Sequence, residues 1–132
     1  QPGGDMSDDR RDFPRIETEH SVELVDGDGS AFPTLALDIS LTGMQLLCDQ
    51  PTAERIAPGG ETKNGDGSPR ELVARLRVKC RDGNRERIGV HCSVMSVRKV
   101  EPDEFRIGVK FTGFEGDSYH ALEAWIDDTL PD

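Results

Sequence analysis

Apolar residues recur at every second position in six separate stretches, and this period of two constrains the fold of the chain more than any other feature. The period is typical of β-strands with one buried face. Turn-forming Gly, Asp and Pro residues separate several stretches, at 26–29, 82–84 and 102–103. Such short links join antiparallel neighbours, because parallel strands need long crossovers. The predicted apolar faces are Val22 and Leu24; Leu35, Leu37 and Ile39; Met44, Leu46 and Cys48; Leu72, Ala74, Leu76 and Val78; Ile88, Val90, Cys92 and Val94; and Phe105, Ile107, Val109 and Phe111.

A helix is predicted after the last strand. Asp117 or Ser118 is a suitable cap for its first turn, and Trp125 borders its apolar face. Six antiparallel strands and one helix predict an all-β fold, a closed or nearly closed six-stranded antiparallel β-barrel with a C-terminal α-helix, since closure removes exposed strand edges. The apolar face expected on the helix is formed by Tyr119, Leu122, Ile126 and Thr129.

The length of 132 residues fits one domain. Residues 1–9 are polar and Gly-rich, which predicts a flexible tail before a single domain at 10–130. Gln1 indicates that the true start is missing or replaced. A Gly- and Pro-rich insertion covers 50–70, with one helical turn expected at 52–56 and a flexible surface excursion after it.

Charge and cysteine usage exclude several classes of protein. The net charge is −10, with a sequence pI near 4.7, which argues against general nucleic-acid binding and against adhesion to anionic membranes. A local site for an anionic ligand remains compatible with it, since charges are screened beyond roughly 8 Å at physiological salt. No apolar run approaches the roughly 20 residues that a membrane-spanning helix needs. Three sparse cysteines indicate a reducing cytoplasm rather than a disulfide framework, and their spacing matches no common zinc site.

No catalytic set is visible. The three histidines are scattered, no nucleophile lies in a recognisable elbow, and the Asp26–Gly29 turn lacks the downstream glutamate of a calcium loop. We therefore expect a binding module and not an enzyme.

Two groups of polar residues suit a guanine nucleotide. Arginines at the start of the chain can bind phosphate, stack on a base or fork onto a guanine edge. After a strand hairpin come an aspartate and a serine that can bond to the other guanine edge, and a glycine that lets a ligand approach the backbone. The hairpin would bring both groups together. Their members are Arg10, Arg11 and Arg15, then Asp38, Ser40 and Gly43.

In this order the residues resemble the two-part motif of PilZ domains, which are bacterial receptors for cyclic di-GMP. Arg11 and Arg15 form its first part, and the Asp38–Gly43 run forms its second. The resemblance extends to the Phe105–Phe111 strand and the helix after it, and covers about residues 9–128. It implies a six-stranded barrel that binds cyclic di-GMP and has no other cofactor.

The resemblance also implies roles for single residues. Arg11 and Arg15 would grip phosphate and guanine. Arg10 would support a second stacked ligand molecule, giving two per chain. Arg98, near the end of the fifth strand, is an expected extra contact. Asp38 and Ser40 would read the guanine edge, and Gly43 would let the strand approach the ligand.

Three function hypotheses follow. The first is a cyclic di-GMP receptor that signals to a protein partner in trans by ordering residues 5–15, with motility, exopolysaccharide synthesis or virulence as the output that the resemblance implies. The second is a PilZ-like adaptor that works by protein contacts, with weak or no nucleotide binding. The third, an oligonucleotide-binding barrel, is disfavoured by the acidic charge and the single Trp and Tyr.

Overall fold

The six predicted strands close into a barrel. The computed structural model describes residues 14–130. Every neighbouring pair of strands is antiparallel, and the order around the barrel is β1-β2-β3-β6-β5-β4. The elements are β1 Ile16–Val25, β2 Ala31–Ile39, β3 Gly43–Cys48, α2 Gln50–Ile56, the 3-10 helix η2 Pro58–Gly60, β4 Glu71–Lys79, β5 Arg85–Glu101, β6 Glu104–Phe114 and α3 Ser118–Thr129. The expected mainly β fold with a C-terminal helix is confirmed.

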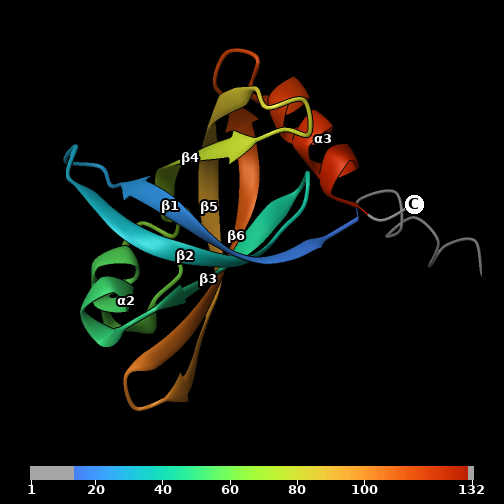
Figure 1. Ribbon diagram of the computed structural model, residues 1–132. Coiled ribbons are helices and arrows are strands. Elements are labelled where there is room, and N and C mark those ends of the chain that lie inside the picture. Colours follow the sequence, from blue (N-terminus) through green and yellow to red (C-terminus); the bar gives the residue numbers. More distant parts are fainter. Residues whose placement is uncertain (1–13, 131–132) are drawn as a thin grey trace, which may run out of the picture.

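The barrel interior is the hydrophobic core, and period-two alternation fills it as predicted on most strands. Leu24, Leu46, Val90 and Ile107 are among the fully buried side chains. Figure 1 shows α3 at one end of the barrel and the tip of the β5–β6 hairpin projecting at the other. Helix α2 contacts β3 and β6, and its first turn is capped by Asp49, whose carboxylate accepts a hydrogen bond from the Thr52 amide.

The predicted inward face of the second strand was correct for Ile39 and wrong for Leu35 and Leu37. Phe32, Ala36 and Ile39 are buried, whereas Leu35 and Leu37 are only half-buried. The register between β2 and β3 shifts between Ala36 and Asp38. Such a bulge adds one residue to one strand, so the alternation changes phase along β2.

The predicted apolar face of the last helix was correct for Leu122 and Ile126 and wrong for Tyr119 and Thr129. The buried face of α3 consists of Ser118, Leu122, Trp125 and Ile126. Tyr119 is 39% exposed and Thr129 is exposed. Two contacts turn the helix this way. The Ser118 hydroxyl accepts a hydrogen bond from the Gly89 amide instead of capping the helix, and the Trp125 ring packs edge-on against His20 at 5.5 Å.

The segment after η2 was expected to be a flexible surface excursion; it lies at the surface and forms a tight turn. The Asn64 amide donates to the Ser68 carbonyl, and Lys63 forms an isolated bridge with Pro69. The Asp66 carboxylate accepts from both the amide and the hydroxyl of Ser68, and these bonds lower the pKa of Asp66.

Candidate functional site

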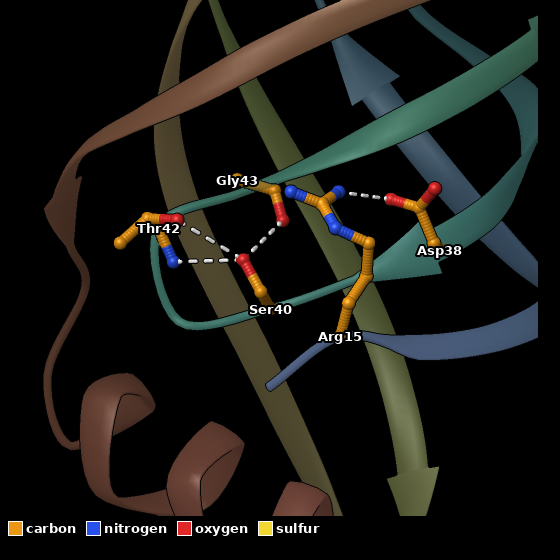
Figure 2. Close-up of polar contacts among 5 residues, drawn as sticks. All are labelled: Arg15, Asp38, Ser40, Thr42 and Gly43. Atoms are coloured by element: carbon orange, nitrogen blue, oxygen red, sulfur yellow. Dashed lines mark hydrogen bonds and ion pairs between the residues drawn. The ribbon is translucent and has the colours of Figure 1, made fainter. Parts of the chain in front are cut away.

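The start of β1 and the end of β2 lie side by side, and this places Arg15 next to Asp38. The strand register pairs Ile16 with Ile39 and Glu17 with Asp38. The Arg15 Nη1 atom donates to Asp38 Oδ1 at 2.5 Å (Figure 2). Both strands have a bulge close to this pair, one between Glu17 and His20 and the other next to Asp38.

The Arg15–Asp38 ion pair is partly exposed. The Arg15 side chain is 52% exposed and that of Asp38 is 21% exposed. An exposed ion pair contributes at most about 1 kcal/mol to stability. The stability of the barrel therefore does not depend on this pair. Among the described residues, Asp38 is the one hydrogen-bond partner of the Arg15 side chain. A guanidinium has five N–H donors, so most remain available to a ligand.

Ser40 is fully buried and closes the turn from β2 to β3. Its amide donates to the Gly43 carbonyl at 2.9 Å. Its hydroxyl accepts from the Thr42 amide at 3.2 Å and donates to the Gly43 carbonyl at 3.3 Å (Figure 2). Ser40 therefore has a structural task in the absence of a ligand. Its expected role in reading a guanine edge remains a prediction.

Gly43 is required by the packing of β3 on β6. A Cβ atom at this position would lie 2.3 Å from the backbone carbonyl oxygen of Val109. Real contacts of this kind are never so short, so any side chain would push the two strands apart. Strand packing alone therefore requires glycine at this position of the motif. The expected close approach of a ligand would be a second, separate reason for it.

The remaining expected site residues lie elsewhere. Arg10 and Arg11 lie outside the described residues. Arg98 is exposed on β5, opposite Arg106 on β6, and Arg106 in turn pairs with Leu47 on β3. Leu47 is four residues from Gly43, roughly 13 Å at about 3.3 Å per residue. Arg98 therefore lies on the same outer wall but at a distance from the turn, and its role as a ligand contact remains a prediction.

Two residues near the turn were missed by sequence reasoning. Thr42 contributes its amide and hydroxyl to the turn, with its Oγ1 atom 3.1 Å from the Ser40 Oγ. Lys110 is exposed and is the strand partner of Gly43, so it adds a cation beside the motif. Thr42 lies inside the motif and could have been identified from the sequence. Lys110 could not, because only the register between β3 and β6 places it beside Gly43.

The cysteines and the other possible metal ligands can be assessed only in the described part of the chain. Within residues 14–130, no group of three or more His, Cys, Asp or Glu side chains is arranged to hold a metal ion. Burial raises the pKa of the Cys92 thiol to about 12 and also raises that of Cys48. Both thiols therefore stay protonated and act as small apolar side chains of the core. No helix in the described part of the chain is long and apolar enough to cross a membrane.

Comparisons with solved structures find the same fold in bacterial proteins. MotI/DgrA, the inhibitor of motility of Bacillus subtilis, superposes with a TM-score of 0.63 at 13% identity, over 89% of this chain and 50% of that one. The PilZ domain of YcgR from Escherichia coli with c-di-GMP gives 0.56 at 15% identity, over 91% of both chains. The complex of K. pneumonia MrkH with c-di-GMP gives 0.52 at 19% identity, over 88% of this chain and 50% of that one.

The chain thus spans about half the length of MotI and of MrkH, and at these identities the likeness shows the fold alone. No curated protein matches. The family assignment comes from the sequence. The profile described as "PilZ domain" matches residues 9–128, a range that includes both parts of the motif, all six strands and nearly all of α3. The chain belongs to the PilZ domain family.

Proposed function

We propose that this chain is a receptor for cyclic di-GMP and not an enzyme. The single observation that carries the proposal is the placement of Arg15 against Asp38, beside the Ser40–Gly43 turn, in a barrel of the PilZ family. Two of the solved neighbours, YcgR and MrkH, are complexes with c-di-GMP. The ligand carries two guanines and two phosphates, which match a guanidinium and a carboxylate held side by side.

On binding, the ligand takes the place of the Arg15–Asp38 ion pair, so that each residue bonds to the ligand and no longer to the other. Arg15 turns its N–H groups to a phosphate or a guanine face, and Asp38 accepts from a guanine edge. Because the pair is partly exposed, separating it costs about 1 kcal/mol or less. Ser40 and Gly43 keep the turn in place and define the edge of the surface on which the ligand lies. Lys110 beside Gly43 adds positive charge.

Arg10 and Arg11 complete the site. They lie outside the described residues, so their contribution rests on the sequence, which places them four and five positions before Arg15. Arg11 grips the first ligand molecule, and Arg10 supports a second, giving two ligands per chain. Binding collects residues 5–15 onto the barrel, and this ordering is the signal that a protein partner in trans detects. The division into a tail at 1–9 and a domain at 10–130 belongs to the same proposal.

The signal controls motility, exopolysaccharide synthesis or virulence. The receptor itself acts in the cytoplasm. A PilZ-like adaptor without nucleotide binding is the alternative. The complete set of five motif positions favours the receptor, because an adaptor could dispense with them.

Isothermal titration calorimetry with cyclic di-GMP, GMP and GTP tests the proposal. We expect a dissociation constant at or below about 1 µM, near −8 to −9 kcal/mol, for cyclic di-GMP alone. Replacing Arg15 or Asp38 with Ala should weaken binding by about 2–4 kcal/mol, because the partner group on the ligand is left unpaired. No heat at about 100 µM ligand, a hundredfold above the expected constant, would leave the adaptor as the better hypothesis.

Arg55→Ala is the matched control. Arg55 forms an ion pair with Asp26 at 3.2 Å, with side-chain exposures of 40% and 19%, which resemble those of Arg15 and Asp38. It should leave ligand affinity unchanged. Arg10→Ala should reduce the stoichiometry from two towards one. Amide hydrogen exchange should show new protection in residues 5–15 on binding, and unchanged exchange there at saturation would remove the ordering mechanism.

A further inference from the structure

Five cations form a continuous row on the outer face of the β4–β5 hairpin. Inward-facing Leu76, Val78 and Ile88 are buried, so the alternate positions face outward. All five cationic side chains are exposed. We call this row the basic stripe, and it consists of Arg75, Arg77, Lys79, Arg85 and Arg87. It stands out on a chain of net charge −10.

The basic stripe works against the stability of the barrel. Arg77 lies directly opposite Arg87, and Lys79 lies directly opposite Arg85. Like charges opposite one another on two strands are destabilising. Within residues 14–130, Arg75 alone of the five has a carboxylate partner, Glu115 at 3.7 Å. The other four cations form no ion pair with any described residue, so no ion pair in the described part of the chain accounts for their arrangement.

A groove runs beside the basic stripe, where the barrel wall opens. The β1–β4 register covers three pairs, from Glu23–Arg75 to Val25–Val73, and the strands then separate. His20 spans the opening by donating from Nε2 to the Arg77 carbonyl at 2.7 Å. The cavity there has a volume of about 910 Å³. Figure 1 shows the β4–β5 turn beside α3, and hydrogen bonds from Arg81 to Asp128 fix it there.

The walls of this groove differ in charge. Arg75, Arg77 and Arg87 line the β4–β5 side together with Glu115, which pairs with Arg75, and Glu19 and Glu23 of β1 line the other side. Apolar Val22, Pro33, Leu76 and Ile88 also line the cavity. A continuous polyanion such as nucleic acid, or an anionic membrane, would meet the carboxylate wall. A peptide can present carboxylates to the cations and uncharged groups to the other wall.

We propose that the basic stripe and its groove dock an extended acidic segment of a partner protein. Successive cations on β4 are two residues apart, about 6.6 Å. Alternate side chains of an extended peptide have the same spacing, so a segment with Asp or Glu at every second position matches the row. The stripe belongs to β4 and β5, whereas the motif turn joins β2 to β3. None of the five cations of the stripe is a motif residue, so the proposed docking does not depend on the proposed nucleotide binding.

Fluorescence anisotropy with a labelled peptide of about ten residues, alternating Glu and Thr, tests the docking surface directly. We expect the wild-type chain to bind this peptide at least about tenfold more tightly than a Lys–Thr counterpart. Raising the salt from about 50 mM to about 300 mM should weaken binding, because the contacts are exposed and screened. Cyclic di-GMP should leave peptide binding intact, so failure of one activity is distinguishable from failure of the other.

Two pairs of variants locate the surface. Arg77→Glu with Arg87→Glu should reduce affinity at least about tenfold. Lys63→Glu with Lys99→Glu changes the net charge equally at exposed positions outside the stripe and should keep affinity within about twofold. Arg77→Gln with Arg87→Gln should also lose binding, and its thermal midpoint should be equal to or above that of the wild type because the repulsion is relieved.

Four results would overturn the proposal. One is the absence of peptide binding at about 1 mM, the weak end of the range in which such contacts are measurable. Another is an equal loss of affinity in both glutamate pairs, which would indicate an effect of overall charge. A third is tighter binding of a single-stranded oligonucleotide or of phosphatidylserine vesicles than of the peptide. The last is self-association of the wild type, measured by sedimentation, that the Arg77→Gln and Arg87→Gln changes abolish.

Discussion

Replacing Gly43 with Ala should destabilise the barrel even when no ligand is present. The added Cβ would lie 2.3 Å from the Val109 carbonyl oxygen and 3.3 Å from the Lys110 Cα, and both atoms belong to the backbone of β6. Neither can rotate away as a side chain could. Strand β3 must therefore move by about 1 Å before the contact reaches an ordinary van der Waals distance.

The cost has two parts. Overpacking of this kind costs about 1–3 kcal/mol. The shift also displaces the Gly43 carbonyl, which accepts hydrogen bonds from the amide and the hydroxyl of Ser40. Weakening one such bond costs about 0.5–1.5 kcal/mol. We expect a total loss of about 2–4 kcal/mol, which corresponds to a fall in the melting temperature of about 10 °C for a chain of this size.

Thermal and urea unfolding of the ligand-free protein measure this loss, and Gly113→Ala is its matched control. Gly113 lies in β6, and a Cβ there would meet nothing closer than His91 Cβ at 3.8 Å. The control should change stability by less than about 1 kcal/mol. A Gly43→Ala variant as stable as the control, with ligand binding lost, would show that the glycine serves the ligand and that the packing argument is wrong.

Three further outcomes are expected. Arg15→Ala should lower the free energy of unfolding by no more than about 1 kcal/mol, since its pair with Asp38 is partly exposed; a larger loss in urea titrations would make the pair structural. Cys92, with its pKa raised to about 12 by burial, should resist iodoacetamide at about pH 8 until the chain unfolds, and mass spectrometry showing native labelling would contradict this. Trp125→Ala should cost about 3–5 kcal/mol in chemical denaturation because the side chain is buried, and a loss below about 1 kcal/mol would indicate that α3 contributes little to the barrel.

The barrel was predictable because each strand carries its own alternation and each turn its own breakers. Val90 and Cys92 face inward for the same reason that Ile88 does, and the Pro102–Asp103 turn joins the two longest strands. These are local properties of the sequence. Closure then follows from the physical cost of leaving two strand edges unpaired.

The errors arose where a distant contact overrides a local pattern. The β2 bulge changes which residues face inward, and no residue in the sequence of β2 indicates that a bulge is present. On α3, periodicity allowed a face that includes Tyr119 as readily as one that includes Trp125. The buried face of α3 is determined by the hydrogen bond between Ser118 and β5 and by the packing of Trp125 against His20 on β1. Both partners lie far away in the sequence.

The candidate site divides in the same way. The spacing of Asp38, Ser40 and Gly43 was visible as a motif, and the hairpin that returns Asp38 to Arg15 was correctly inferred. The motif does not reveal which of its residues are buried and structural and which are accessible to a ligand. Ser40 and Gly43 are buried and maintain a turn and a strand contact, whereas Arg15 and Asp38 are accessible.

The accessibility of Arg15 and Asp38 bears on how the proposed receptor would select its ligand. Arg15 and Asp38 pair with each other, so in the described part of the chain neither of these two charges is left without a partner. A ligand that offers both a phosphate and a guanine edge would replace both partners of the pair at once. A simple anion would satisfy Arg15 but leave Asp38 without a partner. In the proposed receptor the ion pair would therefore select against plain phosphate and favour molecules that carry an acceptor for the arginine and a donor for the aspartate.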